Sequence, residues 1–231
     1  MATKGTIVLL GGGEVGDAVL GTALLGLVPG PRIAILPMAS AFEHPETAVV
    51  EVGTWLQPLG AEVEGLMASS RADADLPELA KRLDEADGAY LTDGSALHLR
   101  TTLKATMLFD RLSALVERGG VLIASGEAAT VLCDPMVDPR GGAPTVGLGP
   151  IRSFTVVPHV GADKDDPRAE KLHRTVALAP ADLSVVSLPA GTALVCRPDG
   201  SYDVLGDRPV EVHRAGKMLD GGVESLTPWN R

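Results

Sequence analysis

Aromatic residues are scarce in this sequence. Only 3% of its 231 residues are Phe, Trp or Tyr, although 45% are hydrophobic. The core must therefore consist mainly of Val, Leu, Ile and Ala, which fill the buried strands of parallel sheets that helices cover on both faces. Cysteine is also scarce, and Cys133 and Cys196 form no C-x-x-C pattern. No disulfide framework or cysteine-based metal site is indicated, and we expect a cytoplasmic protein.

Positive charge is in deficit as well. The chain has 20 Lys and Arg against 30 Asp and Glu, which gives a formal net charge of −10. Because nucleic acids and anionic membranes attract clustered cations, we expect neither as a partner. Long apolar runs are also missing: the stretch from Ala18 to Val28 is too short to span a bilayer and is closed by Pro29.

Aliphatic runs alternate with helix-like segments through residue 132. The predicted strands are Thr6–Leu10, Arg32–Met38, Glu62–Met67, Gly88–Thr92 and Gly120–Ala124. The predicted helices are Asp17–Leu27, Pro45–Leu59, Leu76–Ala86, Ala96–Glu117 in two pieces, and Glu127–Leu132. This alternation predicts an α/β fold with three layers, in which helices cover both faces of a doubly wound, mostly parallel sheet.

The last third of the chain reads as α+β. A glycine-rich loop, Asp138–Gly149, precedes one predicted helix, Arg168–Ala177. The predicted strands are Phe154–Val160, Ser184–Leu188, Thr192–Arg197, Ser201–Leu205 and Val210–Arg214. Asp199-Gly200 is typical of a hairpin turn. We expect these strands to extend the same sheet within one domain, residues 1–231.

The turn after the fifth predicted strand carries the clearest functional pattern. A strand that runs through a tight turn into a short helix is the layout of a nucleophile elbow, which needs small residues two before and two after its centre. With Gly126 at the centre those neighbours are Ala124 and Ala128, whereas Ser125 at the centre would place Ile123 and Glu127 there. The pattern therefore predicts an elbow whose central residue, Gly126, has no nucleophile.

Seven segments in order give the chain a resemblance to a known family. They are LLGGGE (Leu9–Glu14), ILPMASA (Ile35–Ala41), LTDGSALHLR (Leu91–Arg100), IASGEAATVL (Ile123–Leu132), DPRGGAPTVGLG (Asp138–Gly149), VVPH (Val156–His159) and GTALV (Gly191–Val195). Together they resemble the S51 serine peptidases, the cyanophycinase and dipeptidase E group. The resemblance implies a fold like that of the class I glutamine amidotransferases, related to the flavodoxin-like folds, and it is consistent with a homodimer.

The same resemblance implies a Ser-His-acid triad. The serine position matches Gly126, the histidine position matches His159, and Asp138 is the best match for the acid. An oxyanion hole is implied around the family stretch T-G-G-x-Q, which reads Thr92-Asp93-Gly94-Ser95-Ala96 here. We also place Gly12 and Gly13 beside this pocket, and Glu127 directly after the elbow.

The departures from the family pattern favour a protein without normal peptidase activity, with a pocket for a small molecule or short peptide. His159 would have no hydroxyl to activate, and carboxylates at Asp93 and Glu127 would repel an oxyanion. One alternative is an active hydrolase of Asp-containing or β-aspartyl peptides that uses Ser125 and His159. Another is acid/base or metal-assisted chemistry by Glu127, Asp93 and His159. We expect no cofactor.

Several of these residues have simpler structural interpretations. Ser125 would cap the following helix. Asp138 would serve the turn D-P-R-G-G. Asp93 and Glu127 would point to solvent at the strand ends. The glycines that precede Glu14 would form a structural turn, since G-x-G-x-x-G is incomplete without a ribose-binding acid.

Overall fold

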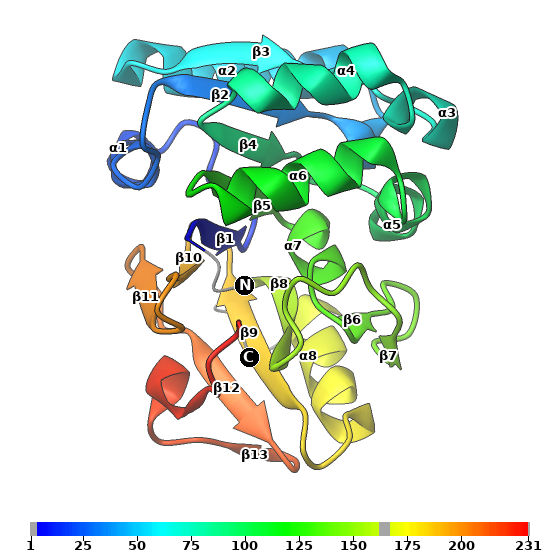
Figure 1. The fold of residues 1–231 in the computed structure, drawn as a ribbon. Coiled ribbons are helices and arrows are strands. Elements are labelled where there is room, and N and C mark those ends of the chain that lie inside the picture. The colour runs from blue at the N-terminus through cyan, green and yellow to red at the C-terminus, as the bar shows by residue number, and fades with distance from the viewer. Residues whose placement is uncertain (1–3, 162–166, 231) are drawn as a thin grey trace.

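A seven-stranded sheet is the centre of the computed structural model, which describes residues 4–161 and 167–230 (Figure 1). In spatial order its strands are β11 (Tyr202–Leu205), β10 (Ala193–Cys196), β1 (Thr6–Leu10), β5 (Val121–Ser125), β4 (Gly88–Leu91), β2 (Arg32–Leu36) and β3 (Glu62–Gly65). The five from β1 to β3 pair in parallel, and β10 pairs antiparallel with β1 and β11. The predicted α/β class is confirmed.

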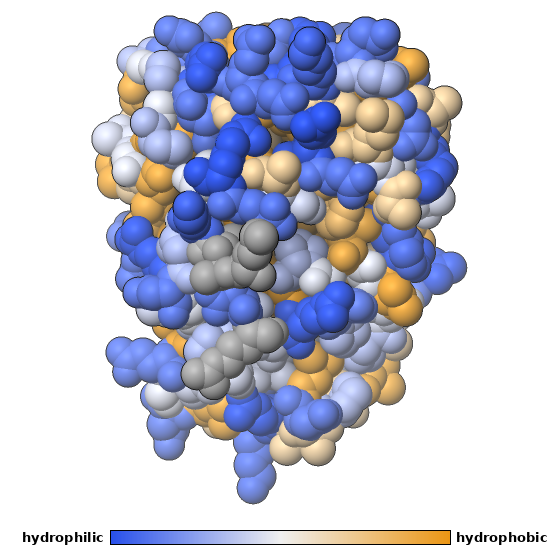
Figure 2. Space-filling view, viewed as in Figure 1, coloured by the Kyte–Doolittle hydropathy of each residue, from blue (hydrophilic) through white to orange (hydrophobic). Residues whose placement is uncertain are grey.

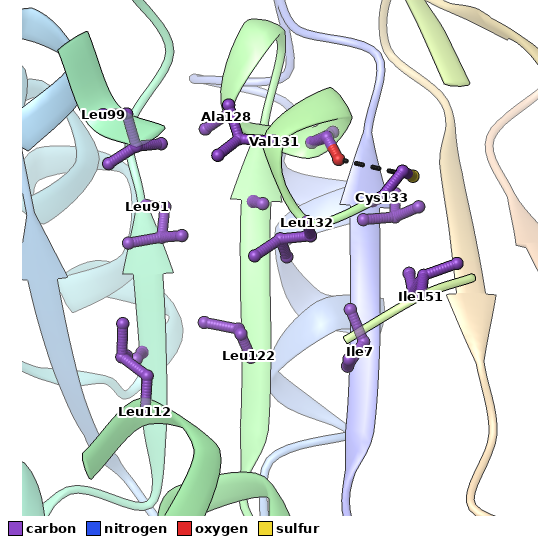
Figure 3. Close-up of a cluster of buried hydrophobic side chains, with 14 of the residues drawn as sticks. Ile7, Leu91, Leu99, Leu112, Leu122, Ala128, Val131, Leu132, Cys133 and Ile151 are labelled. Atoms are coloured by element: carbon purple, nitrogen blue, oxygen red, sulfur yellow. Dashed lines mark hydrogen bonds between the residues drawn. The ribbon is translucent and has the colours of Figure 1, made fainter. Parts of the chain in front are cut away.

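The two faces of this sheet bury separate aliphatic clusters. Along β1, Ile7 and Leu9 point into one cluster and Val8 and Leu10 into the other, as the two-residue period of a strand requires. Helices α1 (Ala18–Leu25) and α2 (Pro45–Leu56) cover the second cluster. Helices α5 (Ala96–Leu103), α6 (Met107–Glu117) and α7 (Glu127–Val131) cover the first, with side chains such as Leu99 and Leu112 against the sheet (Figure 3).

Local sequence signals explain where these helices begin and end. Asp17 caps α1 by accepting hydrogen bonds from the backbone amides of residues 19 and 20, and Thr106 caps α6 by accepting one from the backbone amide of Phe109. Pro45 begins α2, where a missing amide hydrogen costs nothing. The remaining helices are η1 (Met38–Ser40), η2 (Gln57–Leu59), α3 (Arg71–Ala74), α4 (Pro77–Arg82), η3 (Leu83–Glu85), α8 (Pro167–Leu178) and η4 (Gly222–Ser225).

The expectation that all C-terminal strands extend the main sheet is wrong. Only β10 and β11 do so; a second sheet has the order β13 (Lys217–Met218), β12 (Glu211–Arg214), β9 (Ser184–Pro189) and β8 (Phe154–Val160). Strands β8 and β9 pair in parallel with α8 between them, so they form a βαβ unit with its own apolar cluster. Part of the predicted loop 138–149 is also a strand, because β6 (Met136–Val137) pairs with β7 (Pro144–Thr145).

The surface is mostly polar on the face that Figure 2 shows, with apolar residues scattered among hydrophilic ones. Across residues 4–161 and 167–230, none of the helices has both the length and the apolar character to cross a bilayer.

The structure of the core predicts that truncating Leu9 and truncating Val19 to alanine change the free energy of unfolding by very different amounts. Leu9 is fully buried in the central strand β1, whereas Val19 is 81% exposed on α1. We expect Leu9→Ala to lower the free energy of unfolding by about 2–5 kcal/mol, because it leaves a cavity between sheet and helices. Val19→Ala should change it by no more than about 0.5 kcal/mol. Urea unfolding followed by circular dichroism measures both, and equal effects would contradict this description of the core.

Candidate functional site

The turn between β5 and α7 has the backbone of a nucleophile elbow with Gly126 at its tip. Gly126 has φ 53° and ψ −127°, a conformation that L side chains rarely adopt, and it donates its amide hydrogen to the carbonyl oxygen of Leu10. Ala124 and Ala128 are fully buried on either side. The two positions that an elbow centred on Gly126 requires to be small are therefore occupied by buried alanines.

The Asp93 carboxyl group occupies the space in front of this tip. A Cβ atom added to Gly126 would collide with all three atoms of that carboxyl group. Asp93 Oδ1 accepts hydrogen bonds from the backbone amides of Gly94 (2.7 Å) and Glu127 (2.8 Å). The Gly94 amide belongs to the stretch around which the family resemblance implies an oxyanion hole, and the Glu127 amide follows the elbow tip directly, so one carboxylate of the protein bonds to both.

His159 approaches the same carboxylate from the second sheet. It lies at an irregularity of β8 with φ 59°, and its backbone amide donates to the carbonyl oxygen of Gly11. Its Nε2 lies 2.8 Å from Asp93 Oδ2. Gly12 makes this placement possible, because a Cβ there would overlap the imidazole ring. The glycine turn after β1 therefore serves as a structural cradle for His159.

These contacts set the charge state of Asp93. Burial alone raises the pKa of its carboxyl group, but the hydrogen bond and charge of His159 and the amides of Glu127 and Gly94 lower it further, so that the net pKa lies below the ordinary 3.8. Asp93 is therefore ionised at neutral pH. Gly94 allows this loop to pass close to Ala39, because a Cβ at residue 94 would lie 2.5 Å from the carbonyl oxygen of Ala39.

Glu127 does not face solvent and does not line the elbow with free negative charge. Its Oε1 lies 2.6 Å from Nζ of Lys171 on α8, and both side chains are about four-fifths buried. The simpler interpretation, in which both carboxylates point to solvent, is thus wrong for Glu127; the Asp93 side chain is 38% exposed, but its carboxylate is bonded within the protein. No local pattern pointed to Lys171 as the partner of Glu127, because the two residues are 44 positions apart along the chain.

The two predicted serine positions have different surroundings. Ser125 does not cap α7: the N-cap is Gly126 and no side-chain bond caps that helix. The Ser125 side chain instead lines a cavity beside the Tyr90 hydroxyl, one residue before the elbow tip. Ser95 is the residue that caps a helix, since its Oγ accepts from the backbone amide of His98 at the start of α5.

Asp138 is part of a turn. Its two carboxylate oxygens accept hydrogen bonds from the backbone and guanidinium of Arg140, and these bonds lower the pKa of Asp138. Lys171 contributes to the same lowering. The role of Asp138 as the acid behind His159 stays a prediction.

A cavity of about 320 Å³ adjoins the elbow on the side of α2. Gly13, Thr92, Asp93 and Ser125 line it at the carboxyl ends of the strands, where open α/β sheets bind ligands. Other lining residues are Glu14, Val15, Ser40, Glu43, His44, Thr47, Ala48, Glu51, Val52 and Tyr90. Asp93 is therefore shared between the elbow and the cavity.

Sequence reasoning missed the buried pair at the base of this cavity. The Tyr90 hydroxyl donates a hydrogen bond to Glu14 Oε1, and both residues are about 1% exposed. Burial and the neighbouring Glu14 raise the pKa of Tyr90 well above its usual value, so the phenol stays protonated. The available signals were a tyrosine in an otherwise aliphatic strand and a glutamate directly after the glycine turn.

Metal-assisted chemistry by Glu127, Asp93 and His159 has no geometric support in the described residues. Within 4–161 and 167–230, no three His, Cys, Asp or Glu side chains are grouped so that they could hold a metal ion. Asp93 and His159 contact each other, whereas the Glu127 carboxylate contacts Lys171.

Comparisons with known proteins agree with the family resemblance. The model of peptidase family S51 matches residues 7–202. Cyanophycinase of Synechococcus elongatus is 27% identical over 220 residues, which cover 90% of this chain and 68% of that protein. Peptidase E of Streptomyces coelicolor is 30% identical over 207 residues, 83% of this chain and 78% of that protein.

Solved structures agree on the fold. A peptidase from an acI-B1 Actinobacterium has a TM-score of 0.80 at 24% identity, over 99% of this chain and 98% of its own. A putative peptidase E from Listeria monocytogenes has a TM-score of 0.62 at 17% identity, over 91% of this chain and 98% of its own.

The collision at the elbow predicts energetic coupling between positions 93 and 126. We expect backbone strain in Gly126→Ala to destabilise the protein by about 1–3 kcal/mol. The collision of the new Cβ with the Asp93 carboxyl group should lower the stability further. In an Asp93→Gly background the collision is absent, so the cost should fall by about 0.5–3 kcal/mol. A double-mutant cycle by urea unfolding measures this coupling. Gly141→Ala, which meets no atom within 4 Å, is the control; equal costs of Gly126→Ala in both backgrounds would contradict it.

The lowered pKa of Asp93 predicts a pH-dependent contribution to stability. A carboxyl group whose folded-state pKa is depressed stabilises the fold above its unfolded pKa, and this stabilisation disappears as the pH falls through the folded value. The wild type should therefore be more stable than Asp93→Asn at pH 5, and the difference should shrink below about pH 4. Urea unfolding at a series of pH values tests this, and parallel stability profiles would show that Asp93 is not held as described.

Proposed function

The chain belongs to peptidase family S51, and we propose that it is a member without serine peptidase activity that binds a small molecule or short peptide. The observation that carries the proposal is the Asp93 carboxylate, which is bonded to two backbone amides and to His159 in front of a glycine elbow.

The elbow supplies no attacking group. Covalent acyl transfer needs a hydroxyl or thiol within hydrogen-bond reach of a base. Gly126 has no side chain, and the His159 nitrogen that faces the elbow is paired with Asp93 Oδ2 at 2.8 Å. Ser125 precedes the tip and belongs to β5, where it pairs with Leu10.

The position for a developing oxyanion is also taken. Amide donors stabilise a tetrahedral intermediate from 2.7–3.1 Å, the range at which the amides of Gly94 and Glu127 bind Asp93 Oδ1. A substrate carbonyl oxygen would have to displace an ionised carboxylate to reach them. The displaced carboxylate would then repel the charge that forms during attack.

The adjoining cavity supports a binding role. Its volume of about 320 Å³ is at the lower end of small-molecule sites, and hydroxyl groups of Ser40, Thr92 and Ser125 line it. The relatives named cyanophycinase and peptidase E suggest peptide-derived ligands.

Activity assays with a paired variant test the proposal. Wild-type protein should show no labelling by a fluorophosphonate probe and no hydrolysis of Asp-Xaa dipeptides, β-aspartyl-arginine or cyanophycin. The double variant Asp93→Gly/Gly126→Ser empties the oxyanion position and adds a hydroxyl at the tip, so the probe should label position 126. Gly126→Ser alone should remain unlabelled, because Asp93 still occupies that space.

Turnover by the wild type that disappears in His159→Ala would overturn the proposal. Ser125→Ala separates the remaining possibilities: loss of turnover in that variant would assign the nucleophile to Ser125, and unchanged turnover would point to acid/base chemistry by Asp93 and His159.

A further inference from the structure

The cavity beside the elbow has an excess of negative charge. Carboxyl groups line it at Glu14, Glu43, Glu51 and Asp93, and none of the described residues that line it is Lys or Arg. Closely spaced carboxylates in a concave site attract cations and repel anions. Charge alone does not define a site, since acidic surface residues also serve solubility.

Glu14 supplies an independent sign of a missing partner. The residue is 1% exposed, and its Oε1 accepts the hydrogen bond of the Tyr90 hydroxyl. Its Oε2 is buried without a hydrogen-bond partner among the described residues. An unpaired buried carboxylate oxygen is costly, and a ligand donor that reached it from the cavity would remove that cost.

The geometry favours a compact cation. A guanidinium group binds best to both oxygens of one carboxylate, and Tyr90 already occupies one oxygen of Glu14. A divalent metal would need three or more converging ligands, and the described residues form no such group. A primary ammonium group carries three donors, one of which Glu14 Oε2 can accept. The hydroxyls of Ser125 and Thr92 line the same cavity and have further acceptor capacity, although that of Thr92 is already bonded to Ser40.

We infer that Glu14 binds the primary ammonium group of a small amine or amino-acid ligand in this cavity. Tyr90 holds the carboxylate in place through its hydroxyl, and Glu43 and Glu51 add attraction from the side of α2. The inference rests on the proposed function in one respect, since it names the ligand class of the retained pocket.

Calorimetric titration of the whole protein with three probes of equal chain length tests this assignment. The probes are n-butylamine, n-butylguanidine and n-butanol, which differ only in the head group. Butylamine should bind more tightly than butylguanidine, and butanol should give no measurable binding. If butanol binds as tightly as butylamine, or if butylguanidine binds more tightly, the inference is overturned. The titrations of the wild-type protein are sufficient for this test.

A matched pair of variants locates the ammonium group. Glu14→Gln keeps an acceptor for Tyr90 but removes the charge, so the affinity for butylamine should fall about tenfold or more. Glu46→Gln removes the same charge from an exposed position of α2 outside the cavity, so it should leave the affinity unchanged. Equal affinities in the two variants would contradict the role of Glu14.

The melting temperature provides a second readout. Glu14→Gln should melt at a higher temperature than the wild type when both are free of ligand, because a buried charge is lost, and butylamine should no longer raise it. Butylamine contains no peptide bond, so these results do not depend on hydrolysis. If the protein does not bind amines, the inference fails but the proposed lack of peptidase activity is unaffected. If the protein shows peptidase activity, the proposed function fails but amine binding can still be measured.

Discussion

One carboxylate organises the site. Asp93 joins the end of β4 to the start of α7 through the Glu127 amide and to the second sheet through His159, so three separate elements meet on its two oxygens. A single ionised group that accepts from backbone amides and an imidazole is held more firmly than a neutral one. The elbow is therefore closed by a set of internal hydrogen bonds centred on Asp93.

Glycines at two other positions allow that arrangement. Gly12 leaves room for the His159 ring, and Gly94 lets the loop after β4 pass against Ala39. Both have positive φ angles, so the backbone conformation and the close packing each favour glycine at these two positions. The two glycines therefore shape the space in which the Asp93 carboxylate and the His159 ring meet.

The order of elements and the elbow register were readable from the sequence, because each rests on local patterns: aliphatic runs, capping residues, and small residues around Gly126. The partition into two sheets was not, since the partner of a strand such as β8 lies far away along the chain. Side-chain pairing was hidden for the same reason. Neither the contact of Asp93 with the elbow nor those of Glu127 with Lys171 and of Glu14 with Tyr90 follows from spacing.

The mutual exclusion between a side chain at position 126 and the carboxyl group of residue 93 also constrains how the chain can be altered. Any residue other than glycine at position 126 requires the carboxyl group of residue 93 to move or to be removed. The two positions can therefore vary only as a pair.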